Sequence, residues 1–214
     1  MANRSTSGFG LRMAMRLGNT PAIGGQSKYA IKSEPGVGIF KGNPASIQLA
    51  GDTGYVQDSA FSTTDDGNDG GIDFTTANDA LLIGVHNGVF FINSTTNKPT
   101  FANSVAASTA FGTNPNTNST DGVAFVNDDP DQEYVVKADA AVGQAIFGLC
   151  GNINDFAAGD AKDGASTATF DSGAQGETKM FRIVRSAEDP DNEDLASPGA
   201  NIIVVINAAA NTYR

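Results

Sequence analysis

The chain has 214 residues, which is enough for one sizeable hydrophobic core or for two small lobes. Small and polar residues dominate, only 17% of residues are charged and there is no Trp, so the composition argues against long exposed helices and against charge-driven disorder. The formal net charge of −11 argues against direct nucleic-acid binding by the body of the chain.

Basic residues are concentrated at the N-terminus. Residues 1–32 contain no acid, whereas the other 182 residues carry 8 basic and 24 acidic groups. The basic residues of this stretch are Arg4, Arg12, Arg16, Lys28 and Lys32. A basic segment ahead of an acidic body fits packing against a neighbouring acidic subunit, and the alternative is a flexible polar terminus.

Apolar residues recur at every second position in the same stretch, which is otherwise rich in Gly, Ser and Arg. Such alternation suits an extended segment laid along another surface better than an isolated strand. We therefore expect an extended basic arm over residues 1–27 and a single β-rich body over residues 28–214. The arm residues expected to contact a partner are Arg4, Phe9, Leu11, Arg12, Met13, Met15, Arg16 and Leu17.

The rest of the chain alternates short apolar runs with Gly, Asn and Asp, a pattern that predicts an all-β protein. The expected strands are residues 29–32, 37–40, 46–49, 81–92, 180–184 and 201–207, with residues 54–56 closing the first β unit. Long polar stretches at 57–79, 93–121 and 151–178 are expected to be loops, which often carry contacts. The expected architecture is a β-barrel or sandwich-like body with long loops and an extended N-terminal arm.

Residues 123–139 are typical of a strand, an acidic turn and a second strand, and predict a hairpin. Pro130 fixes its φ angle and has no N–H to donate, and the Asn and Asp side chains around it close local turns. Tyr134 and Val136 are expected on one face of the second strand. The carboxylates of the turn resemble a catalytic or calcium site, but we interpret them as a solvated turn; they are Asp128, Asp129, Asp131 and Glu133. A second Asp-Pro-Asp sequence occurs at residues 189–191, in an acidic loop.

Catalytic and metal-binding motifs are scarce. Cys150 is the single Cys, so no intrachain disulfide is possible, and His86 is the single His, which excludes a His/Cys zinc site. No Gly-x-Ser-x-Gly elbow or phosphate loop is present. An EF-hand beginning at Asp65 or Asp66 fails because its twelfth position is Thr76 or Ala77 rather than Glu. We expect no enzymatic activity, no cofactor and no metal, although ion binding by the irregular loop at 65–71 and a β-fold glycosidase stay open as alternatives.

No apolar run approaches the roughly 18 residues of a membrane span, and the N-terminus lacks the apolar segment of a signal peptide. We therefore expect no membrane partner.

The segment at 124–139, Ala-Phe-Val-Asn-Asp-Asp-Pro-Asp-Gln-Glu-Tyr-Val-Val-Lys-Ala-Asp, resembles a motif in structural proteins of tailed bacteriophages, notably marine and cyanobacterial ones. Its turn residues are Asp128, Asp129, Pro130, Asp131 and Gln132. Segments that resemble the same family in the same order are 10–12, 39–44, 84–91, 98–99, 181–184 and 204–207. The departures fall at His86, where an aromatic is commoner, and at Lys137, where Gln is.

The resemblance implies a capsid decoration (cement) protein on the outer surface of the phage head, with the major capsid protein as its partner. It also implies a homotrimer, and the apolar strands 81–92 and 201–207 would gain from burial at a symmetric interface. The alternative is a head-fibre or tail-associated structural protein that binds a receptor or glycan through the loops at 57–79 and 93–121.

Overall fold

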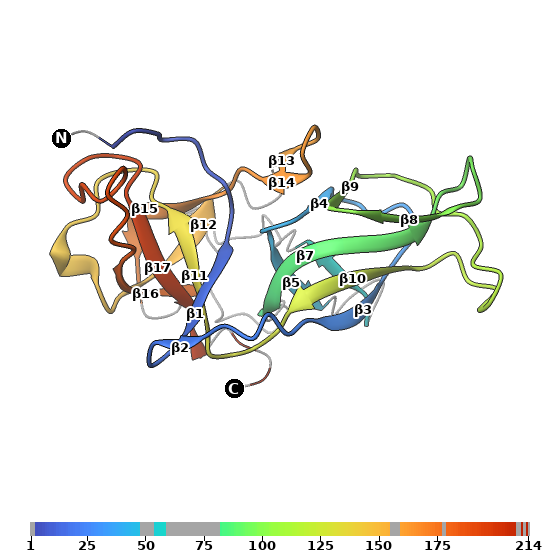
Figure 1. Cartoon of the computed structure of the whole chain (residues 1–214), viewed down its shortest axis with the longest axis horizontal. Helices are drawn as coiled ribbons and strands as arrows, with labels where there is room; N and C mark the ends of the chain where they lie inside the picture. The colour runs from blue at the N-terminus through green and yellow to red at the C-terminus, as the bar shows by residue number, and fades with distance from the viewer. Residues whose placement is uncertain are drawn as a thin grey trace.

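Two curved antiparallel sheets carry most of the chain in the computed structural model, and they lie side by side (Figure 1). The structure describes residues 3–47, 54–58, 82–154, 159–176, 179–208, 211 and 213. Within these residues the one helix is a short 3-10 turn, η1 (Gln144–Ile146). The expectation of an all-β, barrel- or sandwich-like body is confirmed. No helix in the described part of the chain is long and apolar enough to cross a bilayer.

The seven-stranded sheet contains, in spatial order, β15 (Thr169–Gln175), β12 (Cys150–Asn154), β16 (Phe181–Ser186), β17 (Asn201–Ile206), β11 (Gln132–Lys137), β1 (Arg12–Arg16) and β2 (Thr20–Pro21). The six-stranded sheet contains β3 (Ser27–Ile31), β10 (Gly122–Asn127), β7 (Leu82–Ile92), β5 (Pro44–Ile47) and β6 (Val56–Asp58), with β8 (Pro99–Ala102) paired to β7. Two small ribbons pair β4 (Ile39–Phe40) with β9 (Ser104–Val105) and β13 (Gly159–Asp160) with β14 (Ala165–Ser166).

Each sheet covers a hydrophobic core of its own. Tyr134, Phe170 and Phe181 are the largest side chains of the first core, and all three are fully buried. The second core lies against the six-stranded sheet. Strand β7 begins between the two cores, because Leu82 packs into the first and the adjacent Ile83 into the second. A strand buried on both faces needs a mostly apolar run, and the sequence of β7 provides one that only His86 and Asn87 interrupt.

The two most apolar strands, β17 and β7, are therefore buried within the fold of a single chain. All six residues of β17 are buried, as are nine of the eleven residues of β7. The expected apolar interface of a trimer was based on these strands, and they have little apolar surface left for a second copy.

The predicted hairpin at 123–139 is wrong. Strand β10 pairs with β3 and β7 in one sheet, and β11 pairs with β17 and β1 in the other. The turn between them is a corner where the chain passes from one sheet to the next (Figure 1). The Tyr134 hydroxyl donates to the side-chain and main-chain oxygens of Asn127 at 2.9 and 3.2 Å, which ties the two sides of the corner together. The faces of β11 were predicted correctly for Tyr134 and Val136, which are both buried in the first core.

The N-terminal segment, defined here as residues 3–21, differs from the separate arm expected over residues 1–27. Strand β1 adds to the seven-stranded sheet beside β11, and Leu11 is only 3% exposed. The expected alternation also fails to put the apolar side chains on one face. A register shift between Met13 and Arg16 interrupts the β1–β11 ladder, so Met13 shares the face of Tyr134 while Met15 lies beside Val135 on the opposite face.

Candidate functional site

The first Asp-Pro-Asp turn is closed by its own backbone and held by the N-terminal segment. The Asp131 N–H donates to Oδ1 of Asp129 at 3.0 Å, and the Gln132 N–H donates to the Asp129 carbonyl at 3.1 Å. Arg16 places Nε 2.6 Å from Oδ2 of Asp129 and its terminal nitrogen 3.7 Å from Asp131. The Leu17 N–H also donates to the Asp131 carbonyl at 2.8 Å.

The other two polar residues of this turn are also bound. Oδ2 of Asp128 accepts a hydrogen bond from the Tyr29 hydroxyl at 2.7 Å, and the Tyr213 hydroxyl lies 2.5 Å from that of Tyr29. Burial, with these two neighbours adding to it, raises the pKa of Tyr29. Gln132 donates from Nε2 to the Met15 carbonyl at 2.9 Å. The motif residues therefore form a structural corner that joins both ends of the chain to both sheets.

The second Asp-Pro-Asp turn repeats the first. The Asp191 N–H donates to Oδ1 of Asp189 at 3.1 Å, and the Asn192 N–H donates to the Asp189 carbonyl at 2.9 Å. The N-terminal segment again supplies an arginine and a backbone N–H. A terminal nitrogen of Arg4 lies 2.9 Å from Oδ2 of Asp191, and the Arg4 N–H donates to the Asp191 carbonyl at 3.0 Å.

Backbone hydrogen bonding holds the acids of this second loop in their charged form. The pKa of Asp189 is lowered chiefly by the Asp191 N–H, with the amides of Asn192 and Asn201 adding to it. The pKa of Asp194 is lowered by the Ser197 hydroxyl and the Ala196 N–H. Asn3 is anchored to the same loop, where its Nδ2 lies within 3.1 Å of the carbonyls of residues 194, 197 and 198.

These contacts give the basic N-terminal segment acidic partners within its own chain. The Arg16–Asp129 pair is the stronger one, because the two side chains are only 36% and 17% exposed. The Arg4–Asp191 pair is 75% and 59% exposed, so solvent screens it. A neighbouring acidic subunit, which was one of the two sequence-based readings, is not needed to neutralise either arginine.

Phe9 and Arg12 cover a buried lysine. Lys137 is 2% exposed and donates from Nζ to the carbonyls of Ser5 at 2.9 Å and Gly199 at 3.2 Å. The Phe9 ring centroid lies 4.3 Å from the Arg12 guanidinium carbon and 5.7 Å from Nζ of Lys137. Burial lowers the pKa of Lys137, since its charged form is removed from water.

Leu11 is the arm residue for which the structure differs most from expectation. Its side chain belongs to the first core, and its N–H donates to the Gly42 carbonyl at 2.8 Å. Gly10 before it has φ of +69°, and a Cβ there would lie 2.5 Å from Cβ of Ser166. Leu11 is buried and follows the close contact of Gly10 with Ser166, so it is fixed to the body and is not available to a partner.

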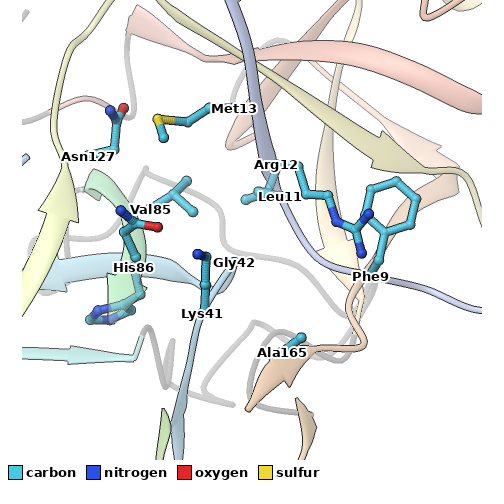
Figure 2. A pocket seen from close by; sticks show the side chains of 11 residues that line it. Phe9, Leu11, Arg12, Met13, Lys41, Gly42, Val85, His86, Asn127 and Ala165 are labelled. Carbon is cyan, nitrogen blue, oxygen red and sulfur yellow. The ribbon is translucent and has the colours of Figure 1, made fainter. Parts of the chain in front are cut away.

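A cavity of about 300 Å³ lies at the seam between the N-terminal segment and the six-stranded sheet. Its walls include Leu11, Met13 and Val85, with His86 and Asn127 beside them. Figure 2 shows the Lys41 side chain reaching toward the space between Val85 and Leu11, and the Arg12 guanidinium lying against the Phe9 ring.

A second hollow, of about 560 Å³, lies on the face of the seven-stranded sheet that turns away from its core. Met15, Val135 and Ile203 form its apolar part, and Arg185 and Glu188 are its charged residues. Arg185 binds the buried carboxylate of Glu133 through two hydrogen bonds of 2.6 Å, which raises the pKa of Arg185. We refer to this hollow as the Met15 groove.

Three of these residues stabilise the fold in a way that the sequence did not predict: Glu133, Lys137 and Arg185. A signal was present, since Glu133 and Lys137 lie two positions before and after Val135 in a strand whose other residues, apart from Gln132, are apolar or aromatic. Charged residues at such positions need buried partners.

The reactive residue types are placed as structural residues. Cys150 is not in a disulfide and is 1% exposed, and His86 is 2% exposed. In the described part of the chain, no three side chains of His, Cys, Asp or Glu are grouped to hold a metal ion. The possible ion-binding loop at 65–71 lies outside the described residues.

Comparisons with protein-family models, curated proteins and solved structures gave no match. Support for a function therefore comes from the chain's own sequence and geometry.

Proposed function

We propose that the chain is a non-enzymatic capsid decoration (cement) protein of a tailed bacteriophage. In this proposal it binds the outer surface of the head and stabilises the capsid by bridging neighbouring subunits of the major capsid protein. The motif resemblance suggests this class, and the exposed part of the N-terminal segment suggests where the capsid protein binds.

The observation that carries the proposal is the concentration of exposed apolar side chains near the N-terminus. Seven large hydrophobic side chains are exposed in the described residues, and four of them lie between residues 13 and 23. These four are Met13 at 38%, Met15 at 44%, Leu17 at 37% and Ile23 at 80%. Exposed apolar side chains of this kind favour protein binding, and those of Met13 and Met15 lie on opposite faces of β1.

The location also suits a protein partner. Strand β2 is one of the two edge strands of the seven-stranded sheet, and no described strand pairs with its outer edge, where a further strand can add. The adjacent Met15 groove offers an apolar floor of Val135 and Ile203 for a side chain of the major capsid protein. Met residues adapt to irregular partner surfaces because their side chains are unbranched and flexible.

A homotrimer stays part of the proposal, but the mostly buried strands β7 and β17 can contribute little to its interface. The head-fibre or tail-associated alternative differs in copy number. A cement protein is present in hundreds of copies per virion and a fibre protein in far fewer, so an electron cryo-microscopy map of the assembled virion separates the two.

Removal of residues 1–27 is a poor test of capsid binding, because it removes β1 and Leu11 from the fold. Substitution of Met15 by Glu places a charge in the Met15 groove and leaves the buried residues intact. We expect Met15→Glu to melt near the parent and to cosediment poorly with capsids stripped of this protein. Leu149→Glu is the matched control, since Leu149 is 43% exposed at a different site. If the double variant Met15→Glu, Leu17→Glu occupies capsids as fully as the parent, the proposed binding site is refuted.

A further inference from the structure

Three aromatic rings lie in a row on the six-stranded sheet. Phe101 on β8 is paired in register with Phe90 on β7, and their ring centroids are 4.6 Å apart. The Phe125 ring, on β10, lies 6.2 Å from that of Phe101 with an angle of 22° between the planes. Phe101 is 73% exposed, whereas the other two rings are half-buried. Phe101 is therefore the middle ring of the row, held in place by both neighbours and open to solvent (Figure 1 shows β7, β8 and β10).

The exposed ring borders a shallow groove of about 550 Å³. Its polar lining comes from three amide side chains, Gln26, Asn87 and Asn103, and its apolar lining from Phe101, Phe125 and Ala102. Among the described residues no charged side chain lines this groove, although the exposed Lys28 is the cross-strand neighbour of Phe125. A groove of this volume is large enough for one or two sugar rings.

A glycine keeps the floor of the groove open. Gly88 pairs in register with Phe125 and has φ of +148°, in a region that residues with side chains rarely adopt. A Cβ at this position would lie 3.2 Å from the Ala102 carbonyl oxygen. Because Gly88 has no side chain, β7 does not cover the side of Phe125 that faces Gly88.

The amides are held in place and keep polar atoms for a ligand. Asn87 donates from Nδ2 to Oε1 of Gln26 at 2.8 Å, and Asn103 donates from Nδ2 to the Asp163 carbonyl at 3.0 Å. These bonds leave the Gln26 amide nitrogen as a donor and the side-chain oxygens of Asn87 and Asn103 as acceptors. The groove thus combines a donor, acceptors and aromatic rings without a charge.

We propose that this groove binds a neutral saccharide. A pyranose ring has an apolar C–H face that packs on an aromatic ring, and hydroxyls that both donate to and accept from amides. The described lining residues of the groove include no cation for an anionic ligand, and the net charge of −11 disfavours a nucleotide. This site is distinct from the Met15 groove, so it can be occupied whether or not the chain binds a capsid.

The test is an NMR titration of the full chain with neutral sugars: glucose, galactose, mannose, N-acetylglucosamine and their short oligomers. We expect saturable shifts of the backbone amides of Gly88, Phe101 and Asn103 with at least one sugar at about 20 mM, as befits a shallow site. Phe101→Ala should weaken binding about tenfold, because the stacking platform is lost, and Phe101→Tyr should keep it within about threefold. Asn87→Ala should weaken binding while the melting temperature changes little.

Leu149→Ala is the control, because it removes an exposed apolar side chain outside the groove and should leave sugar binding unchanged. The proposal is overturned if no sugar of the panel shifts the groove amides, or if Phe101→Ala binds as tightly as the parent. Self-association of the parent that Phe101→Ala abolishes, without any sugar binding, would instead make the aromatic row a protein-docking surface.

Discussion

Replacement of Leu11 by Ala separates an N-terminal segment that is part of the fold from an arm that orders only on binding. Leu11 is 3% exposed and packs in the first core, next to the backbone contact between its N–H and the Gly42 carbonyl. Truncation of a buried Leu to Ala costs about 2–5 kcal/mol, through lost burial and the cavity that is left. In a chain of this length each kcal/mol lowers the melting temperature by about 2–4 °C, so we expect a fall of roughly 4–20 °C.

The matched control is Leu17→Ala, in the same segment but 37% exposed. Exposed substitutions usually change stability by about 0.5 kcal/mol or less, so this variant should melt within about 2 °C of the parent. Thermal unfolding followed by circular dichroism gives both values. Limited trypsin digestion adds a local readout, because Arg12 and Arg16 lie in the segment and should be cut faster in Leu11→Ala.

The N-terminal segment is not part of the fold if Leu11→Ala has the melting temperature of the parent and trypsin removes the segment from the parent protein without loss of the folded body. That result would restore the free arm over residues 1–27 that the sequence suggested.

Arg185→Met should destabilise the chain by about 2–3 kcal/mol in urea unfolding, because it leaves the buried Glu133 carboxylate without its partner, and adding Glu133→Gln should recover at least half of the loss. The lowered pKa values of Asp189 and Asp194 stabilise the fold above the ordinary aspartate pKa, and this stability is lost as the pH falls through the lowered values. The melting temperature should therefore fall when the pH is lowered below about 4. An equal fall in Asp189→Asn would contradict the contribution assigned to Asp189. Asp129→Asn should cost up to about 1 kcal/mol and Asp131→Asn less, because Arg16 lies closer to the more buried Asp129; equal melting temperatures would count against this. Pro130→Gly should cost about 0.4–1 kcal/mol by freeing the unfolded chain, and an unchanged melting temperature would argue against that.

The strands that the sequence predicted well are those with continuous apolar runs. Strands β7 and β17 are buried on both faces, so almost any register hides their side chains and the run alone identifies them. Strands β12 and β15 were missed in the expected loop at 151–178, because β15 is built mostly from small and polar residues. Its signal was Phe170, which is fully buried.

The partners of each strand were harder to predict than the strands themselves. The strand–turn–strand pattern of 123–139 predicts two strands and a turn correctly, yet it carries no information on whether those strands pair with each other. Here both edges of β10 and both edges of β11 are taken by strands distant in sequence. The aromatic groove was hidden for a similar reason, since Phe101 is the single large apolar residue of β8 and lay within an expected loop.

The contacts of the N-terminal segment also determine when it can dock during folding. Asn3 binds the carbonyl of a residue 191 positions later, and Lys137 binds the carbonyl of Ser5 across 132 positions. During synthesis residues 3–11 must therefore wait for partners that are made long after them, and contacts of such long range slow folding. Until residues 189–201 have been synthesised, Phe9 and Leu11 have no complete site to fill. The segment then docks only after residues 189–201 are present, and its apolar side chains are exposed to other molecules until then.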